Sequence, residues 1–147
     1  TLKGTLELSV EKRFSGGGDG VVKDNETGLV WCKRDSWQIY QDWLTFQEAM
    51  SWVDKLNKKD FLGFHDWRMP EKDEIKKLFL PTSTILGRSN QELHLDHVFE
   101  PGGGNGSWCM PFDQRAAFYF SYTSGILQTF DQDFSQGYLR IVRLYPD

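Results

Sequence analysis

The chain has 147 residues, a length typical of one domain spanning residues 1–147. A net charge of −4 and a pI near 5.4 argue against broad binding of nucleic acid, because such binding depends on a positive surface. Aromatic residues make up 15% of the chain, which is enough either for a large core or for a surface that stacks on ligands.

The N-terminal part of the chain predicts strands. Residues 5–10 (TLELSV) alternate between polar and apolar side chains, the pattern of an antiparallel edge strand that can pair with another chain. Residues 21–31 predict a hairpin, because β-branched and aromatic residues flank the turn sequence DNETG. Gly28 is available for the positive φ that such a turn uses.

Two helices are expected next. The first spans residues 45–57, where Thr45 and Glu48 form a T-x-x-E capping box and Asn57 can end the helix. Pro70 suits the first position of the second helix, which has acidic residues near its start and lysines near its end, as the helix dipole favours. The expected buried stripe of the first helix consists of Phe46, Ala49, Met50, Val53 and Leu56.

The second half of the chain predicts loops and then strands. Residues 81–114 show no periodicity and contain PGGGNG, which cannot hold a regular element, so we expect an ordered loop region. Strand-like segments at 116–124, 126–135 and 138–145 predict a β-meander. The whole order predicts an α+β fold, in which two helices pack on a small, mainly antiparallel sheet and the N- and C-terminal strands lie close together.

The sequence GFHDWRMP at residues 63–70 has the residue types of an active site, but its spacing favours a structural role. Asp66 and Arg68 flank Trp67, so in an extended segment the two charged side chains project to one side and the indole to the other. We expect Trp67 to be buried against the helices and Arg68 to pair with Glu74. If that pair is buried, removing Arg68 costs roughly 3–5 kcal/mol.

The two cysteines, Cys32 and Cys109, are far apart in the sequence. If they are paired, the disulfide contributes roughly 4 kcal/mol in the chain-entropy model. The alternative is two buried free thiols, and the sequence leaves both open. There is no C-x-x-C motif and no Cys/His cluster, so a zinc site is not expected.

Five blocks of the sequence lie within residues 14–144: DNETGLVW, FQEAMSWVDKLN, GFHDWRMPEKDEIKKLF, FYFSYTS and YLRIVRL. Together they resemble the Lcl C-terminal domain family, named after the Legionella collagen-like protein and long catalogued as a domain of unknown function. The run RMPEKDE is also similar to a segment of formylglycine-generating-enzyme-like domains. Both resemblances imply a C-type-lectin-like fold whose long loop region carries ligand contacts. The chain departs from the family pattern at Glu71, Phe120 and Ile141, where members tend to have Ser or Thr, Trp, and Cys.

An enzymatic function has little support in the sequence. The formylglycine-type oxidases that the resemblance brings in use two cysteines close together near the C-terminal end, and this chain has no such pair. We therefore expect that the protein is not an enzyme.

Metal binding is also not expected. The residues His94, Asp96 and His97 are a plausible metal corner, but polar loop residues are the favoured interpretation. Asp131 and Asp133 could bind calcium or act as acid and base, but a solvated hairpin edge explains them better. The EPG sequence that begins at Glu100 is half of the motif of calcium-dependent sugar lectins, and the W-N-D part is missing. We expect no strong calcium requirement and no cofactor.

The resemblance implies extracellular attachment, so we expect a non-catalytic binding or adhesion module that recognises a glycan or a protein surface through its loop region. The acidic balance makes a neutral glycan or a protein surface the more consistent ligand. Trp108 could instead anchor its own loop, and the sequence leaves both roles open. The candidate contact residues are Asn105, Trp108, Phe112, Asp113, Arg115 and Tyr122.

The alternative function is a structural subunit of a cell-surface or filament assembly, and a homo-oligomer is left open. The expected location is extracellular or at the cell surface, with the periplasm as an alternative. No apolar run approaches the roughly 20 residues of a membrane span, so membrane insertion is not expected. The chain starts at Thr1 without Met, which indicates a processed or trimmed fragment, so the missing signal peptide says nothing about export.

Overall fold

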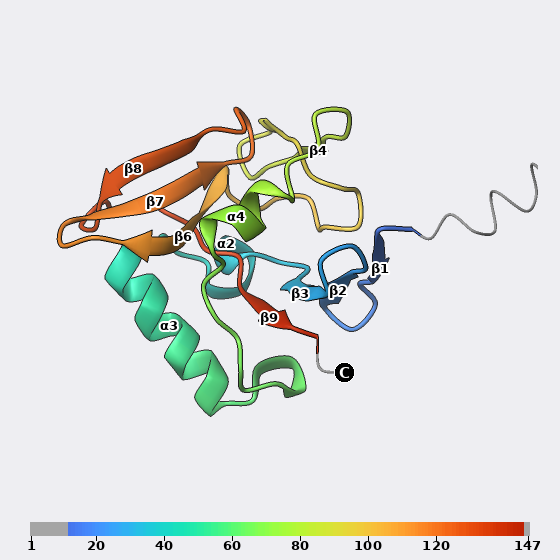
Figure 1. The fold of residues 1–147 in the computed structure, drawn as a ribbon, viewed down its shortest axis with the longest axis horizontal. Helices are drawn as coiled ribbons and strands as arrows, with labels where there is room; N and C mark the ends of the chain where they lie inside the picture. Colours follow the sequence, from blue (N-terminus) through green and yellow to red (C-terminus); the bar gives the residue numbers. More distant parts are fainter. Residues whose placement is uncertain (1–11, 146–147) are drawn as a thin grey trace, which may run out of the picture.

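The computed structural model describes residues 12–145, and within them the fold is α+β (Figure 1). Three α-helices and three small antiparallel sheets make up this part of the chain, which confirms the predicted fold class. The predicted strand at residues 5–10 lies outside the described residues. The helices are α2 (Ser36–Tyr40), α3 (Phe46–Lys58) and α4 (Lys72–Lys76), with a 3-10 turn η1 (Phe61–Gly63) after α3.

The first sheet joins the two ends of the described chain. Its strand order is β1-β2-β3-β9, and all its pairs are antiparallel. β2 and β3 form the predicted hairpin, with Gly28 at φ +75° in the turn. The last strand pairs with β3, where Trp31 lies opposite Val142, so early and late segments of the chain share one sheet as expected. The strands are β1 (Phe14–Gly16), β2 (Val21–Asp24), β3 (Leu29–Cys32) and β9 (Val142–Leu144).

The second sheet corrects the prediction for the loop region and the meander. Its order is β6 (Gly106–Phe112), β7 (Ala116–Ser121) and β8 (Leu127–Asp131), whereas we expected residues 81–114 to be irregular throughout. Gly106 is the first residue of β6. A side chain does not fit there, because a Cβ would lie only 2.1 Å from the carbonyl oxygen of Phe120 on β7. The glycine that suggested a loop therefore serves close strand pairing. The expected third strand of the meander, β9, belongs to the first sheet instead.

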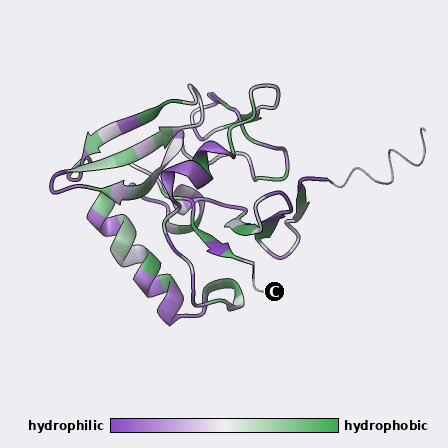
Figure 2. Cartoon of the chain, viewed as in Figure 1, coloured by the Kyte–Doolittle hydropathy of each residue, from purple (hydrophilic) through white to green (hydrophobic). Residues whose placement is uncertain are grey.

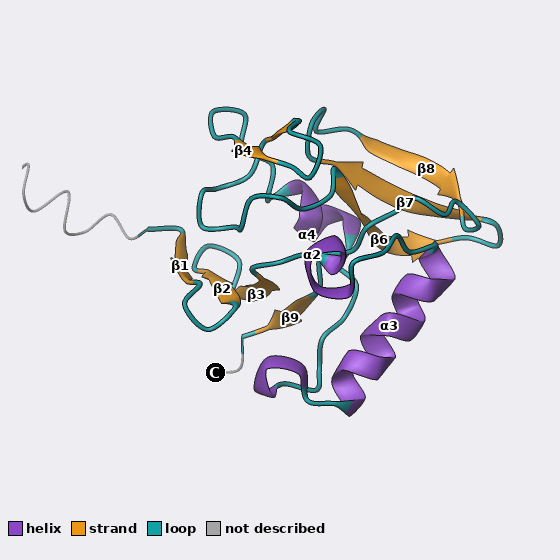
Figure 3. Ribbon diagram, turned by 180° about the vertical axis from the view of Figure 1, so that it is seen from behind, coloured by secondary structure: helices purple, strands orange, loops and turns teal. Residues whose placement is uncertain are grey.

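The segment between α4 and β6 is mostly loop, as predicted (Figure 3). It contains only the short third sheet, formed by β4 (Ile85–Leu86) and β5 (Glu92–Leu93). Leu93, Leu95 and Phe99 from this segment are fully buried, so the loop region packs on the rest of the molecule.

Helix α3 begins as predicted and ends slightly later. The Thr45 hydroxyl accepts the backbone N–H of Glu48 at 3.1 Å, and the Glu48 carboxylate accepts the backbone N–H of Thr45 at 2.9 Å. The helix continues to Lys58, because the Asn57 side chain binds both backbone polar groups of Trp67, each at 2.8 Å, and not the helix end. Hydrophobic and hydrophilic residues alternate along α3 (Figure 2).

The predicted buried stripe of α3 needs one correction. Trp52 is 7% exposed and belongs to the core, whereas Met50 is 36% exposed. The other four predicted positions of the stripe are buried. Helical spacing allows either neighbour of the stripe to face inward, and the larger indole takes the buried place.

The starts of the two short helices were predicted less well. α4 begins at Lys72 rather than Pro70, because the backbone N–H of Glu71 donates to the Glu74 carboxylate at 2.8 Å and makes Glu71 the N-cap. α2 was not predicted. Its cap is a D-x-x-Q capping box formed by Asp35 and Gln38, a local signal that sequence alone contains.

The GFHDWRMP segment has the structural contacts that its spacing predicted. Trp67 is 2% exposed and donates its indole N–H to the carbonyl of Phe61 at 2.9 Å. Both oxygens of Glu74 accept from the Arg68 guanidinium at 2.8 Å, so the predicted pair is confirmed. It is only partly buried, however, with side-chain exposures of 36% for Arg68 and 20% for Glu74. Asp66 pairs with Arg143 of β9 at 2.6 Å.

The possible disulfide is not formed. Cys32 and Cys109 are both buried free thiols, and they belong to two different hydrophobic clusters of the core. Burial raises the pKa of Cys32, and it raises the pKa of Cys109 to about 12. Both thiols are therefore protonated packing residues. Among residues 12–145, no helix has the length and apolar character needed to cross a membrane.

Candidate functional site

Four side chains from separate segments form an aromatic–arginine cluster beside the loop region. Trp37 lies on α2, and Trp43 lies between α2 and α3. Arg88 lies in the turn between β4 and β5, and Tyr138 lies in the chain that leads to β9. Trp37 and Trp43 are close in the sequence, but Arg88 and Tyr138 are far from them and from each other, so only the tertiary fold brings the four residues together.

The Arg88 guanidinium is the centre of the cluster. Its carbon lies 3.5 Å from the ring centroid of Trp37 and 5.3 Å from that of Trp43, which are cation–π distances. The Tyr138 hydroxyl accepts from Arg88 Nη1 and from the Trp43 indole N–H, each at 3.0 Å. The two indole centroids are 5.6 Å apart. These contacts hold the rings and the cation in one arrangement.

Buried hydrogen bonds of α2 hold this arrangement in place. The fully buried Asp35 carboxylate accepts the backbone N–H of Gly104 at 2.6 Å as well as that of Gln38 at 3.2 Å. Ser36 exchanges hydrogen bonds with the backbone of Leu139, next to Tyr138 in the chain. The start of α2 is therefore joined both to the glycine-rich loop and to the segment that carries Tyr138.

The glycine-rich loop is needed for the close approach of Tyr138. A Cβ on Gly104 would lie 2.2 Å from the Tyr138 ring, which no side-chain adjustment accommodates without displacing that ring. The neighbouring Gly103 carbonyl accepts the backbone N–H of Arg88 at 2.7 Å. The loop thus positions both polar members of the cluster, and its glycines have a steric reason.

The charge of Arg88 is not neutralised locally. Within residues 12–145, no carboxylate lies within 4.0 Å of its guanidinium, whereas Arg34 and Arg143 each form a salt bridge. Trp43 is 37% exposed. The cluster therefore presents exposed aromatic area next to a cation that keeps hydrogen-bond donors available.

Two of the residues predicted to contact a ligand are core residues. Trp108 is fully buried, donates its indole N–H to the carbonyl of Leu44 at 3.0 Å and packs edge-on against Phe46. Tyr122 is also fully buried, and burial raises its pKa. We withdraw both from the candidate contact surface, because neither side chain has area that a ligand can reach. Of the two roles that the sequence left open for Trp108, the buried side chain fits the anchoring role.

The remaining predicted contact residues do not form one surface. Asn105 is exposed at the start of β6, where its side chain accepts the Tyr119 hydroxyl at 3.0 Å. Phe112, Asp113 and Arg115 are exposed around the β6–β7 turn, at the other end of that strand. Figure 1 shows this turn and the β4–β5 loop at opposite ends of the molecule. A binding role for these four residues stays a prediction.

The residues considered for metal binding do not belong to a cluster of His, Cys, Asp or Glu ligands in the described part of the chain. Within residues 12–145, no group of three or more His, Cys, Asp or Glu residues is placed to hold a metal ion. The His94 ring packs against Phe79 in a tilted arrangement, with the ring centroids 5.0 Å apart, and the side chain of Glu100 forms a salt bridge with Arg34 at 3.1 Å.

A model of the Lcl C-terminal domain family matches residues 20–143. The chain belongs to the Lcl C-terminal domain family. The match covers all four residues of the aromatic–arginine cluster and nearly all of the described part of this Lcl C-terminal domain. No curated protein sequence matches the chain.

None of the four cluster residues of this Lcl C-terminal domain was among the residues predicted to contact a ligand. A usable signal was present for three of them. Trp37 and Trp43 stand in a polar segment without an apolar stripe to bury them, and Arg88 belongs to the lysine-free part of the chain, where arginine indicates fixed guanidinium contacts. Tyr138 had no such signal, because it lies in a segment that predicted a strand.

Proposed function

We propose that this domain is a non-catalytic extracellular binding module that attaches to a glycan or a protein surface. Membership in the Lcl C-terminal domain family supports a location at the cell surface or outside the cell, as expected for a part of a collagen-like surface protein. A C-type-lectin-like arrangement is part of this proposal. It is supported by the sheet that joins early and late strands and by the long loop region between α4 and β6.

The observation that carries the proposal is the cluster of Trp37, Trp43 and Arg88, in which Trp43 is exposed and the other two side chains are half-buried. Trp, Tyr and Arg are the residue types that contribute most to binding energy at protein interfaces. An exposed indole also offers an apolar face to the C–H face of a sugar ring, and the free donors of Arg88 can bind sugar hydroxyls or a backbone carbonyl. Because the rings are already held by Tyr138, little side-chain entropy is lost on binding.

The ligand class follows from the charges around this site. The net charge of −4 disfavours long polyanions, which need an extended positive surface. Arg88 is a single cation that lies against the Trp37 ring and near the Trp43 ring, an arrangement that suits a neutral sugar or a protein loop. A neutral glycan or a protein surface is therefore the proposed ligand.

The cysteines support a non-catalytic role with respect to the oxidases that the sequence also resembled. Those enzymes use a reactive thiol pair, and thiol reactivity requires the thiolate form. Here both thiols are buried, and burial raises the pKa of each. Neither cysteine has the low pKa and exposure of a reactive thiol.

The test compares two exposed aromatic residues at different places. Trp43→Ala removes the more exposed indole of the cluster, and Phe112→Ala removes a ring of similar exposure, 43% against 37%, at the β6–β7 turn. Both variants and the original domain are applied to a glycan array and to extracts of partner cells, after circular dichroism has shown that they are folded. We expect binding to be lost in Trp43→Ala and kept in Phe112→Ala.

Two outcomes contradict this proposal. If Phe112→Ala loses binding and Trp43→Ala does not, the contact surface is the β6–β7 turn that the sequence predicted. If the original domain binds neither glycans nor any extract protein saturably, the domain is not an attachment module.

A structural subunit of a surface assembly is the second candidate. β8 pairs only with β7 within the described residues, so its outer edge is available for strand pairing, and Ile126 beside it is 58% exposed. Light scattering tests this function. A stable trimer or polymer favours the assembly role if the Ile126→Lys variant is monomeric under the same conditions. A domain that is monomeric at high concentration argues against this role.

A further inference from the structure

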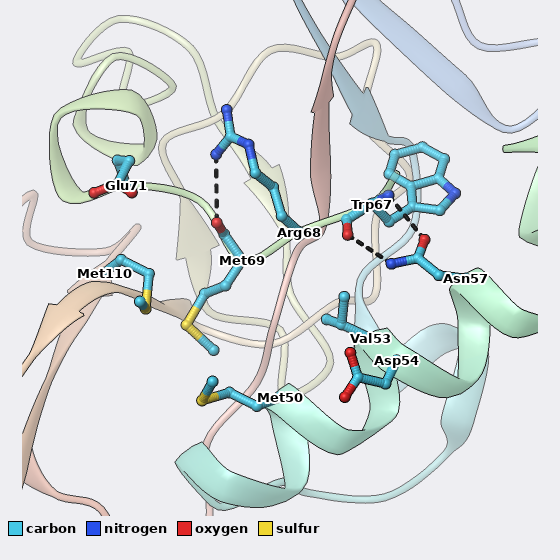
Figure 4. A pocket seen from close by; sticks show the side chains of 9 residues that line it. All are labelled: Met50, Val53, Asp54, Asn57, Trp67, Arg68, Met69, Glu71 and Met110. Carbon is cyan, nitrogen blue, oxygen red and sulfur yellow. Dashed lines mark hydrogen bonds between the residues drawn. The ribbon is translucent and has the colours of Figure 1, made fainter. Parts of the chain in front are cut away.

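All three methionines of the chain line one pocket. Met50 comes from α3, Met69 from the segment before α4, and Met110 from β6. The pocket has a volume of about 300 Å³ and is separate from the aromatic–arginine cluster. In Figure 4 the thioether ends of the three side chains point toward one another into the pocket. Its lining residues are Met50, Val53, Asp54, Asn57, Trp67, Arg68, Met69, Glu71 and Met110.

The use of methionine here is not explained by packing alone. The chain contains 11 Phe residues and many aliphatic ones, yet the three facing positions of this pocket all carry a thioether. Methionine commonly fills irregular gaps in a core. This pocket is open, however, and Met50 is 36% exposed, so at least one thioether faces space that no protein atom fills.

The charges around the pocket favour a cation. Asp54 and Glu71 are the two acidic residues of its lining. Arg68 is the only basic residue among the lining residues, and its guanidinium is already bound by both oxygens of Glu74 at 2.8 Å. A positive ion in the pocket would therefore lie among residues that include two acidic side chains and no unpaired basic one.

The donor set indicates which kind of cation fits. No His or Cys is among the lining residues, so the pocket lacks the ligands that zinc prefers. Thioether sulfur is a soft ligand that selects Cu(I) over harder ions. We propose that Met50, Met69 and Met110 form a binding site for a soft monovalent cation of the Cu(I) and Ag(I) class, with Asp54 and Glu71 balancing its charge.

The three methionines make a direct test possible. The folded chain is labelled with carbon-13 in its methionine methyl groups and titrated with Ag(I) in chloride-free buffer, because Ag(I) binds like Cu(I) and is not oxidised. Because the chain contains three methionines, its spectrum should contain three methionine methyl signals. We expect all three to shift together and to stop shifting at one equivalent. Binding at Cys32 or Cys109 alone would leave the methionine signals in place.

Two variants serve as ligand removal and control. Met69→Leu and Met110→Leu remove one sulfur each while conserving side-chain volume. Each should weaken Ag(I) binding by at least the roughly 10–100-fold that loss of an outer-shell partner costs at metal sites. Leu80→Met is the control. It places a thioether against the hydrophobic cluster that contains Cys109, outside the lining of this pocket, and its additional methyl signal should not move.

The proposal is overturned by either of two results. The first is a shift confined to Met50, which would show that Ag(I) binds one exposed thioether. The second is unchanged affinity in both folded leucine variants, or no shift in any methionine signal at one equivalent. The same titration measures no glycan or protein ligand, so its outcome is independent of the proposed attachment function.

Discussion

At the scale of single residues, two tryptophans with the same chemistry have opposite roles. Trp108 is fully buried with its indole N–H bonded to the Leu44 carbonyl, and it packs against Phe46 and Tyr119. Trp43 is 37% exposed and shares the Tyr138 hydroxyl with Arg88. Trp108 was predicted from its residue type to contact a ligand. Its burial makes it a core residue, whereas Trp43 keeps exposed area.

The core role of Trp108 predicts a large loss of stability on truncation. Trp108→Ala should lower the free energy of unfolding by about 3–5 kcal/mol, because it removes a buried indole and leaves a cavity. Phe112→Ala, at a position that is 43% exposed, should cost much less. Equilibrium urea denaturation of the two variants measures the difference. Equal losses in both would mean that Trp108 is not a core residue.

The Arg68–Glu74 pair is worth less than a buried pair, because both side chains keep some exposure. We expect Arg68→Ala to lower the free energy of unfolding by roughly 1–3 kcal/mol, below the cost of breaking a buried pair and above that of a surface pair. Arg115→Ala is the control, because Arg115 is exposed and should cost little. Urea denaturation decides the size, and an Arg68 variant as stable as the control would contradict a structural role.

At the scale of elements, the caps of α2 and α3 use the same chemistry for different purposes. Thr45 caps α3 at its exposed end, and its hydrogen bonds stay within the helix start. Asp35 caps α2 but is fully buried, and its second oxygen also accepts the Gly104 N–H. The α3 cap therefore serves one helix, whereas the α2 cap also positions the loop that supports Arg88 and Tyr138.

This difference predicts separate effects of the two cap variants. Thr45→Ala should cost about 1 kcal/mol of stability, the usual value of an N-cap. Asp35→Ala should cost roughly 1–3 kcal/mol more, because a buried backbone N–H loses its acceptor. Only Asp35→Ala should also change the tryptophan fluorescence and near-ultraviolet circular dichroism of the aromatic–arginine cluster. A variant at Asp35 with unchanged spectra would contradict its role in positioning the loop.

At the scale of the whole molecule, ion pairs join the GFHDWRMP segment to two other elements. Arg143 of β9 holds Asp66, and this hydrogen bond lowers the pKa of the Asp66 carboxyl. Burial alone would raise the pKa of Glu74, but the hydrogen bonds from Arg68 and from the Glu71 backbone outweigh it, so the pKa of Glu74 is lowered. The segment is thus joined to the first sheet and to α4 by ionised carboxylates.

These lowered pKa values predict acid sensitivity. A carboxyl whose pKa is lower in the folded state stabilises the protein fully above its unfolded pKa, here near the ordinary values of 3.8 for Asp and 4.5 for Glu. That stabilisation is lost as the pH falls through the folded pKa. We expect the free energy of unfolding to decrease below about pH 4.5, and Asp66→Asn combined with Glu74→Gln should flatten this decrease. Urea denaturation across the acid range measures the slope, and an unchanged slope in the double variant would rule out these two carboxyls.

The sequence by itself determined the features that depend on neighbours along the chain. The hairpin of β2 and β3, the capping box of α3 and the Arg68–Glu74 pair each involve residues a few positions apart, so periodicity and local hydrogen bonding were enough to predict them. The α+β class followed from the order of such local elements.

The tertiary structure alone decided which side chains meet across the sequence. It placed Arg88 against Trp37 and Trp43, buried Trp108 and Tyr122, and gathered three methionines from α3, β6 and the segment between them. These contacts depend on how distant segments pack. An aromatic residue or a methionine can be buried or exposed, so its neighbours in the sequence do not indicate which of the two it is. The physical reason is that burial is a property of the packed chain, whereas a cap or a turn is a property of a few consecutive residues.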